Sequence, residues 1–62
     1  MKIQSREDLL AVIEELIERY PDWRFGQLVS NVAGWADREI WDIEDGEFLQ
    51  AAQFHLRQFA KV

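Results

Sequence analysis

Apolar residues recur at intervals of three and four along the first third of the chain and predict a helix over residues 6–20. Charged residues fall mostly on the opposite side of this helix, as at Glu14, Glu15 and Glu18. Ser5 is expected to cap the helix, because its hydroxyl can accept a hydrogen bond from a first-turn amide. The apolar stripe comprises Leu9, Leu10, Val12, Ile13, Leu16, Ile17 and Tyr20.

A proline ends this pattern, and a second helical pattern starts almost at once. Pro21 has no backbone N–H to donate within a helix, and Asp22 can cap a new one. The spacing predicts a helix over residues 23–33, which Gly34 would end in the left-handed conformation. Its buried positions would be Phe25, Leu28, Val29 and Val32.

Helical spacing returns over residues 46–60. Asp45 is the expected cap, or else Glu44 caps and Ile43 forms a hydrophobic staple with Phe48. The buried positions of this helix would be Phe48, Leu49, Ala52, Leu56, Phe59 and Ala60.

Residues 35–43, between the second and third helices, keep no helical period. They contain Trp35, Ile40 and Trp41, which are too apolar for a free loop. A single strand here would have no partner. We therefore expect an extended lid, packed over the open end of the helix pair and forming part of the core.

These elements predict an all-α class, a compact three-helix domain with an aromatic-rich connector between the second and third helices. Residues 1–62 form a single small helical domain. A chain of 62 residues without cysteine has neither a large core nor a disulfide to stabilise it. The expected core is Leu9, Ile13, Leu16, Phe25, Leu28, Val32, Phe48, Leu56 and Phe59.

The charge balance narrows the classes of partner. Twelve acidic residues against seven basic ones give a net charge of −5, which argues against a general nucleic-acid binder and against an anionic membrane surface. No apolar run approaches the length that spans a bilayer, and no secretory signal is visible at the N-terminus. The expected location is cytoplasmic, which the absence of cysteine suits.

The sequence offers little for catalysis. His55 is the only histidine, and we expect it to pack its ring at the edge of the core. No motif supports a nucleophile, so we expect no enzyme activity and no cofactor. The acidic residues of 37–47 fail the calcium-loop pattern, because Trp41 stands where an acid is required. No metal site is therefore predicted.

Two groups of residues are candidates for binding a protein. Trp23 and Phe54 lie off the core stripes on helical wheels, and they either form an exposed aromatic patch or are covered by the connector. Asp42, Glu44 and Asp45 belong to a dense acidic segment. Part of this segment should cap the last helix, and the rest could steer a basic partner.

A third candidate surface lies on the predicted second helix. Arg24, Gln27 and Asn31 share one side of it. Such residues can read base edges, and the helix follows a tight turn as a recognition helix does. Few basic residues stand nearby to hold phosphates, so a plain solvated face or a protein contact is the competing interpretation.

Two short motifs carry a resemblance. The segment Tyr20–Leu28 reads Tyr-Pro-Asp-Trp-Arg-Phe-Gly-Gln-Leu, and Ile43-Glu44-Asp45 opens the last helix. With these motifs the chain resembles an uncharacterised family of short bacterial proteins. The resemblance implies no activity, but it suggests that Arg24 and Gln27 matter. The segment with Trp35 and Trp41 departs from the family pattern.

The leading hypothesis is a non-enzymatic protein–protein interaction module of bacterial origin, whose protein partner is unknown. One alternative is a helix-turn-helix-like DNA-binding protein that reads through the second helix. Another is an acidic decoy of a basic nucleic-acid-binding protein. We also expect a homodimer, because a second copy could bury Trp23 and Phe54 and enlarge a marginal core.

Overall fold

Three helices make up the computed structural model, which describes the backbone of residues 3–59 and the side chains of residues 6–58. Helix α1 spans Ile3–Arg19, α2 spans Phe25–Trp35 and α3 spans Asp45–Phe59. Residues 3–59 contain no strand. The predicted all-α, three-helix class is therefore confirmed.

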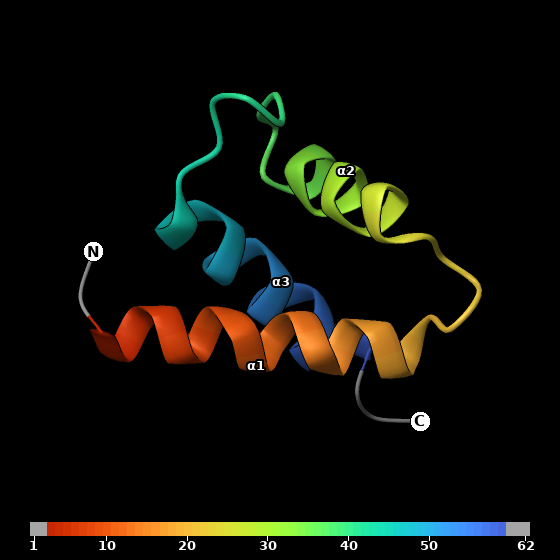
Figure 1. Ribbon diagram of the computed structural model, residues 1–62. Coiled ribbons are helices and arrows are strands. Elements are labelled where there is room, and N and C mark those ends of the chain that lie inside the picture. The colour runs from red at the N-terminus through yellow and green to blue at the C-terminus, as the bar shows by residue number, and fades with distance from the viewer. Residues whose placement is uncertain (1–2, 60–62) are drawn as a thin grey trace.

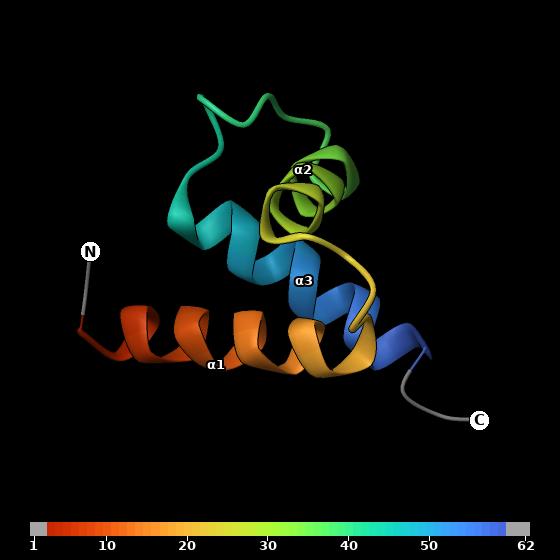
Figure 2. The same ribbon diagram turned by 45° about the vertical axis from the view of Figure 1, so that its right-hand side comes forward.

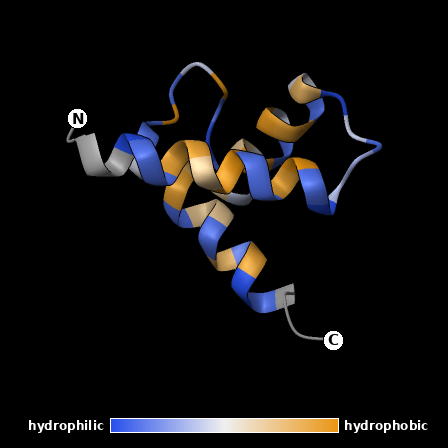
Figure 3. Ribbon diagram, turned by 60° about the horizontal axis from the view of Figure 1, so that its bottom comes forward, coloured by the Kyte–Doolittle hydropathy of each residue, from blue (hydrophilic) through white to orange (hydrophobic). Residues whose placement is uncertain are grey.

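Helix α3 lies between the other two helices. It crosses α1 on one side and packs against α2 on the other, whereas α1 and α2 touch each other least (Figures 1 and 2). The connector of residues 36–44 rises on the side of the molecule away from α1. Apolar and polar positions alternate around α1 and α3 (Figure 3), which is the pattern expected of helices that bury one face.

The core is built from all three helices. Leu16 and Val32 are completely buried, one on α1 and one on α2, and Ala52 of α3 is equally buried. Such close packing leaves little room for change of volume at these positions. The buried hydrophobic residues are Val12, Leu16, Leu28, Val32, Ala33, Phe48, Ala52 and Leu56.

The predicted core needs one correction and two refinements. Phe25 is 61 % exposed, so its assignment to the core is wrong; Trp23 packs against the core at this corner instead. Leu9 and Ile13 are only partly buried and pack at the edge of the core. The predicted positions Phe59 and Ala60 lie outside the side chains that the structure describes.

The turn between α1 and α2 is longer than predicted. It includes Trp23, whose N–H donates to the carbonyl of Tyr20 at 3.1 Å. Arg24 has an extended backbone and occupies the cap position of α2, so the assignment of Asp22 as cap is wrong. The carboxamide Oε1 of Gln27 accepts a hydrogen bond from the Arg24 N–H at 3.0 Å, which satisfies one amide at the start of the helix.

Two other helix ends also differ from the sequence prediction. α1 begins at Ile3, so Ser5 lies within the helix and does not precede it. α2 continues through Gly34, and Asp37 instead takes the left-handed conformation, with φ of 59°. The N–H of Arg38 donates to Ala33 and that of Asp37 donates to Gly34, at 2.9 and 3.0 Å. This pair of bonds is the Schellman pattern that ends many helices.

The start of α3 decides between the two predicted caps. The helix begins at Asp45, so Glu44 is the preceding residue and the assignment of Asp45 as cap is wrong. The Glu44 N–H donates to Oε1 of Glu47 at 3.0 Å, which repeats the arrangement of Arg24 and Gln27 in α2. Phe48 belongs to the core, and Ile43 is partly buried and packs against it. The two residues precede and follow the cap in the positions of a hydrophobic staple.

Candidate interaction surface

The connector presents two large apolar side chains to solvent at the tip of a turn. The N–H groups of Asp42 and Ile43 both donate to the carbonyl of Glu39 at 3.0 Å. Ile40 and Trp41 occupy the two central positions of the turn formed by residues 39–42, and they are 51 % and 95 % exposed. The prediction of a lid that buries these residues is therefore wrong. We call this element the Ile40–Trp41 turn.

The turn is attached to the helices on both sides. Before it, the N–H of Arg38 is bound to α2 through the carbonyl of Ala33. After it, Ile43 packs against the core. These anchors leave only a few residues between two fixed points, so the chain must turn where Ile40 and Trp41 lie.

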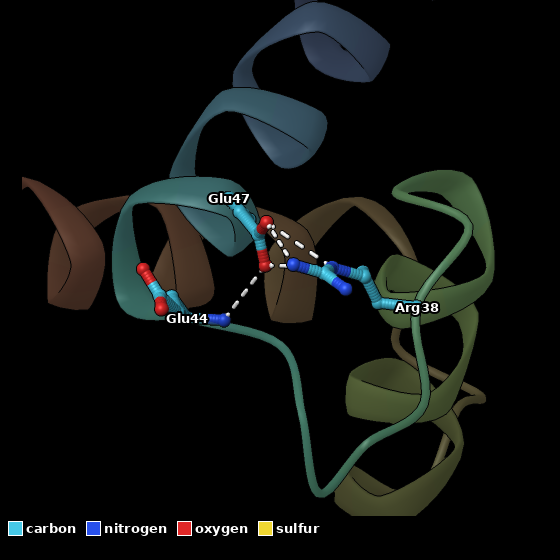
Figure 4. Close-up of polar contacts among 3 residues, drawn as sticks. All are labelled: Arg38, Glu44 and Glu47. Carbon is cyan, nitrogen blue, oxygen red and sulfur yellow. Dashed lines mark hydrogen bonds and ion pairs between the residues drawn. The ribbon is translucent and has the colours of Figure 1, made fainter.

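An ion pair adds a third attachment. The guanidinium of Arg38 approaches both carboxylate oxygens of Glu47: Nε lies 3.1 Å from Oε1 and 3.1 Å from Oε2, and Nη2 lies 2.8 Å from Oε2 (Figure 4). Oε1 of Glu47 also accepts the Glu44 N–H. One carboxylate therefore caps α3 and holds the start of the connector against it.

The pKa values follow from this arrangement. The Arg38 guanidinium and the Glu44 amide stabilise the charged carboxylate and lower the pKa of Glu47. The hydrogen bonds and the negative charge of Glu47 in turn raise the pKa of Arg38, and the charges of Asp42 and Glu44 add smaller effects. Because the pair is exposed to solvent, it fixes the position of the connector more than it stabilises the fold.

Carboxylates surround the Ile40–Trp41 turn. The predicted acidic residues Asp42, Glu44 and Asp45 are all exposed, as are Asp37 and Glu39. Asp42 and Glu44 lie close enough to Arg38 to affect its pKa. The turn is thus an apolar tip within an acidic rim, and sequence reasoning missed it by placing Trp41 in the core.

Trp23 does not join an exposed patch with Phe54, so that hypothesis is wrong. Its ring is stacked on Tyr20 with centroids 4.1 Å apart and lies 6.3 Å from the ring of Trp35. Trp35 is stacked on His55 at 3.7 Å, and the Tyr20 hydroxyl lies 2.6 Å from Nε2 of His55. Tyr20 and Trp23 lie in the turn between α1 and α2, Trp35 is the last residue of α2, and His55 is on α3. The four rings therefore connect all three helices.

His55 therefore has a structural setting. Burial is the main cause that lowers its pKa, and the positive charge of Arg19 lowers it further. A neutral imidazole can accept the Tyr20 O–H through Nε2. The histidine lies at the edge of the core, as predicted, and the spacing of 35 residues to Tyr20 explains why the sequence could not show this contact.

Phe54 lies in a different place, beside a shallow groove between the end of α2 and the outer face of α3. The side chain is 60 % exposed. The groove has a volume of about 610 Å³ and is lined by Trp35, Ala36, Glu47, Gln50, Ala51, Gln53, Phe54 and Arg57. We call it the α2–α3 groove.

The three residues of the predicted DNA-reading face are not equivalent. Arg24 and Gln27 are exposed, but Asn31 is partly buried. The Oε1 of Gln27 is engaged with the backbone of Arg24. Arg24 and Gln27 thus form the capped start of α2, and with Asn31 they do not make a uniformly exposed row.

Comparisons with protein-family models, with curated proteins and with solved structures find no match to this chain. Within the part of the chain that the structure describes, no helix is both long and apolar enough to cross a membrane. The described side chains also include no group of three or more His, Cys, Asp or Glu arranged to hold a metal ion.

Proposed function

We propose that this protein is a non-enzymatic protein–protein interaction module that contacts its partner through the Ile40–Trp41 turn. The observation that carries the proposal is the 95 % exposure of Trp41 on a connector anchored to both neighbouring helices. Burial of a tryptophan side chain is strongly favourable in free energy, and Trp41 does not obtain this gain within its own chain. The neighbouring residues are mostly acidic or polar and do not cover the indole.

The geometry suits recognition because the turn is held before binding. Ordering a mobile loop costs conformational free energy on association. Here the Glu39 hydrogen bonds, the Arg38–Glu47 pair and the core contact of Ile43 restrict the turn in advance. Tryptophan is also among the residues that most often dominate the binding energy of protein interfaces.

The carboxylates around the turn favour a protein surface over other ligands. Exposed acidic residues repel phosphate backbones and anionic lipids. They also oppose burial of the turn in an apolar surface that lacks hydrogen-bond donors, because the charged groups would lose water. A protein surface with an apolar pocket and polar or basic groups around it meets both requirements.

Trp41→Ala tests the proposal in a capture experiment. The immobilised wild-type chain and the variant are exposed to lysate of the source cells, and the retained proteins are quantified. Phe25→Ala is the matched control, because Phe25 is another exposed aromatic residue, at the start of α2. We expect the amount of a specifically retained protein to fall at least about tenfold with Trp41→Ala. With Phe25→Ala the amount should stay the same as with the wild type. Equal retention by all three chains would contradict the proposal.

A further inference from the structure

The Ile40–Trp41 turn and the α2–α3 groove lie next to each other in the fold. The connector leaves α2 at Ala36, which lines the groove, and rejoins α3 just before Glu47, which also lines it. The connector that carries the turn therefore joins two residues that line the groove. Trp41 is almost fully exposed, so it does not fill the groove of its own chain.

We infer that the partner is a second copy of this chain, and that Trp41 of each copy enters the α2–α3 groove of the other. This inference rests on the proposed role of the Ile40–Trp41 turn and names its partner. Each copy carries both the projecting residue and the groove, so one two-fold axis produces two identical contacts and closes the assembly.

The lining of the groove matches an indole. Trp35 and Phe54 supply aromatic surface, and both are partly exposed, at 37 % and 60 %. Aromatic rings gain energy from offset or edge-to-face contacts beyond the area that they bury. The side-chain carbonyl of Gln50 or Gln53 can accept the indole N–H.

The charges near the two parts are also complementary. Glu39 and Asp42 flank the Ile40–Trp41 pair in the turn. Arg57 lines the groove as a cation, and the other charged lining residue, Glu47, is already paired with Arg38. Bringing Trp41 into the groove of a second copy brings these carboxylates toward a positive charge. This local attraction sets the register of the contact, because acidic groups elsewhere on the two copies repel.

The surface of the chain is large enough for such a dimer. A specific interface buries at least about 1,000 Å² in total, or about 500 Å² on each partner. The solvent-accessible surface of one copy is 4956 Å², so each copy would contribute roughly a tenth of its surface. The net charge of −5 on each copy opposes association, so we expect salt to tighten the dimer by screening.

Sedimentation equilibrium and thermal unfolding at micromolar and near-millimolar concentrations test the inference. We expect a wild-type dimer whose melting temperature rises with concentration. Trp41→Gln and Phe54→Gln should each raise the dissociation constant by about tenfold or more. Leu10→Gln is the control: Leu10 is 62 % exposed on α1 and belongs to neither part. Circular dichroism checks that every variant keeps its helices.

Mixing the two variants tests the reciprocal geometry directly. A Trp41→Gln chain keeps its groove, and a Phe54→Gln chain keeps its tryptophan. Their mixture can therefore form one of the two contacts, whereas neither variant alone can form any. We expect heterodimers in the mixture that are tighter than either variant homodimer and weaker than wild type.

Three outcomes would overturn the inference: a wild-type monomer of 7.4 kDa at both concentrations, a dimer unaffected by both substitutions, or a mixture without heterodimers. A monomer that still captures another protein through Trp41 would leave the proposed function intact and show that the partner is not a second copy. Retention of such a protein that weakens as the salt concentration rises would show that it is a basic partner.

Discussion

Asp37 takes the left-handed conformation that ends α2, whereas the sequence predicts Gly34 to do so. Gly34 is the residue expected to end α2, because glycine readily adopts positive φ. The helix instead passes through Gly34, and Asp37 adopts φ of 59°. Aspartate tolerates this conformation better than most residues, but its carboxylate stands at the helix end that favours positive charge.

Asp37→Gly is expected to stabilise the fold by about 0.5–1 kcal/mol, because glycine relieves the left-handed strain and the substitution removes an unfavourable charge. Part of this gain is offset by the greater freedom of glycine in the unfolded chain. Urea unfolding measures the change. Asp37→Ala is the control, since it removes the same charge but keeps Cβ. A gain in Asp37→Ala as large as in Asp37→Gly would show that charge, and not backbone strain, is responsible.

At the scale of elements, the connector is held by its ends while its middle contacts solvent. The Arg38–Glu47 pair connects its first residues to the first turn of α3. The pair is exposed, so its loss should change the position and mobility of the connector more than the stability of the helices. The amides of residues 37–43 report on this mobility.

Arg38→Gln is expected to speed hydrogen exchange of the connector amides by several-fold and to leave the melting temperature nearly unchanged. The Glu47 carboxylate can still accept the Glu44 N–H in this variant, so α3 keeps its cap. Arg6→Gln removes the same charge from an exposed position on α1 and should leave the connector unaffected. Unchanged exchange in Arg38→Gln would mean that the backbone anchors alone hold the turn.

At the scale of the whole molecule, the Tyr20–His55 bond joins the end of α1 to α3. Burial and Arg19 lower the pKa of His55 below its ordinary value of 6.5. The unfolded chain therefore takes up a proton at a higher pH than the folded chain does. The contribution of His55 to stability is therefore fully present above about pH 6.5 and is lost as the pH drops below it, because protonation of His55 favours the unfolded state.

Urea unfolding of the wild type and of His55→Gln between pH 7.5 and pH 5.5 tests this dependence, in a range above the ordinary titration of carboxylates. We expect the free energy of unfolding of the wild type to decrease toward pH 5.5. In His55→Gln the decrease should be much smaller, although the variant is less stable throughout because it loses the stacking on Trp35. Parallel pH profiles would show that His55 does not cause the decrease.

Periodicity, together with Pro21, Gly34 and the expected caps, predicted three helices within three residues of their bounds, and periodicity identified Leu16, Leu28, Val32, Phe48 and Leu56 as buried. These predictions succeed because a helix fixes which of its own residues share a face. The helical wheel of the second helix wrongly predicted that Trp23 is off the core and that Phe25 is in it. It assumed that α2 begins at residue 23, but Trp23 lies in the turn before the helix. The direction of its side chain is therefore set by the turn and by the stacking on Tyr20.

The sequence by itself determined the helical class, the sharp break at Pro21 and the acidic character of the connector, because these depend on neighbouring residues or on composition. Only the tertiary structure decided that Trp41 stands in solvent, that Tyr20 meets His55, and that Trp35 and Phe54 line one groove. In a segment outside a helix, apolar residues follow no regular spacing from which their direction can be predicted. Their exposure depends on where the packed helices leave the two ends of the connector, and helix packing joins residues that are far apart in the chain.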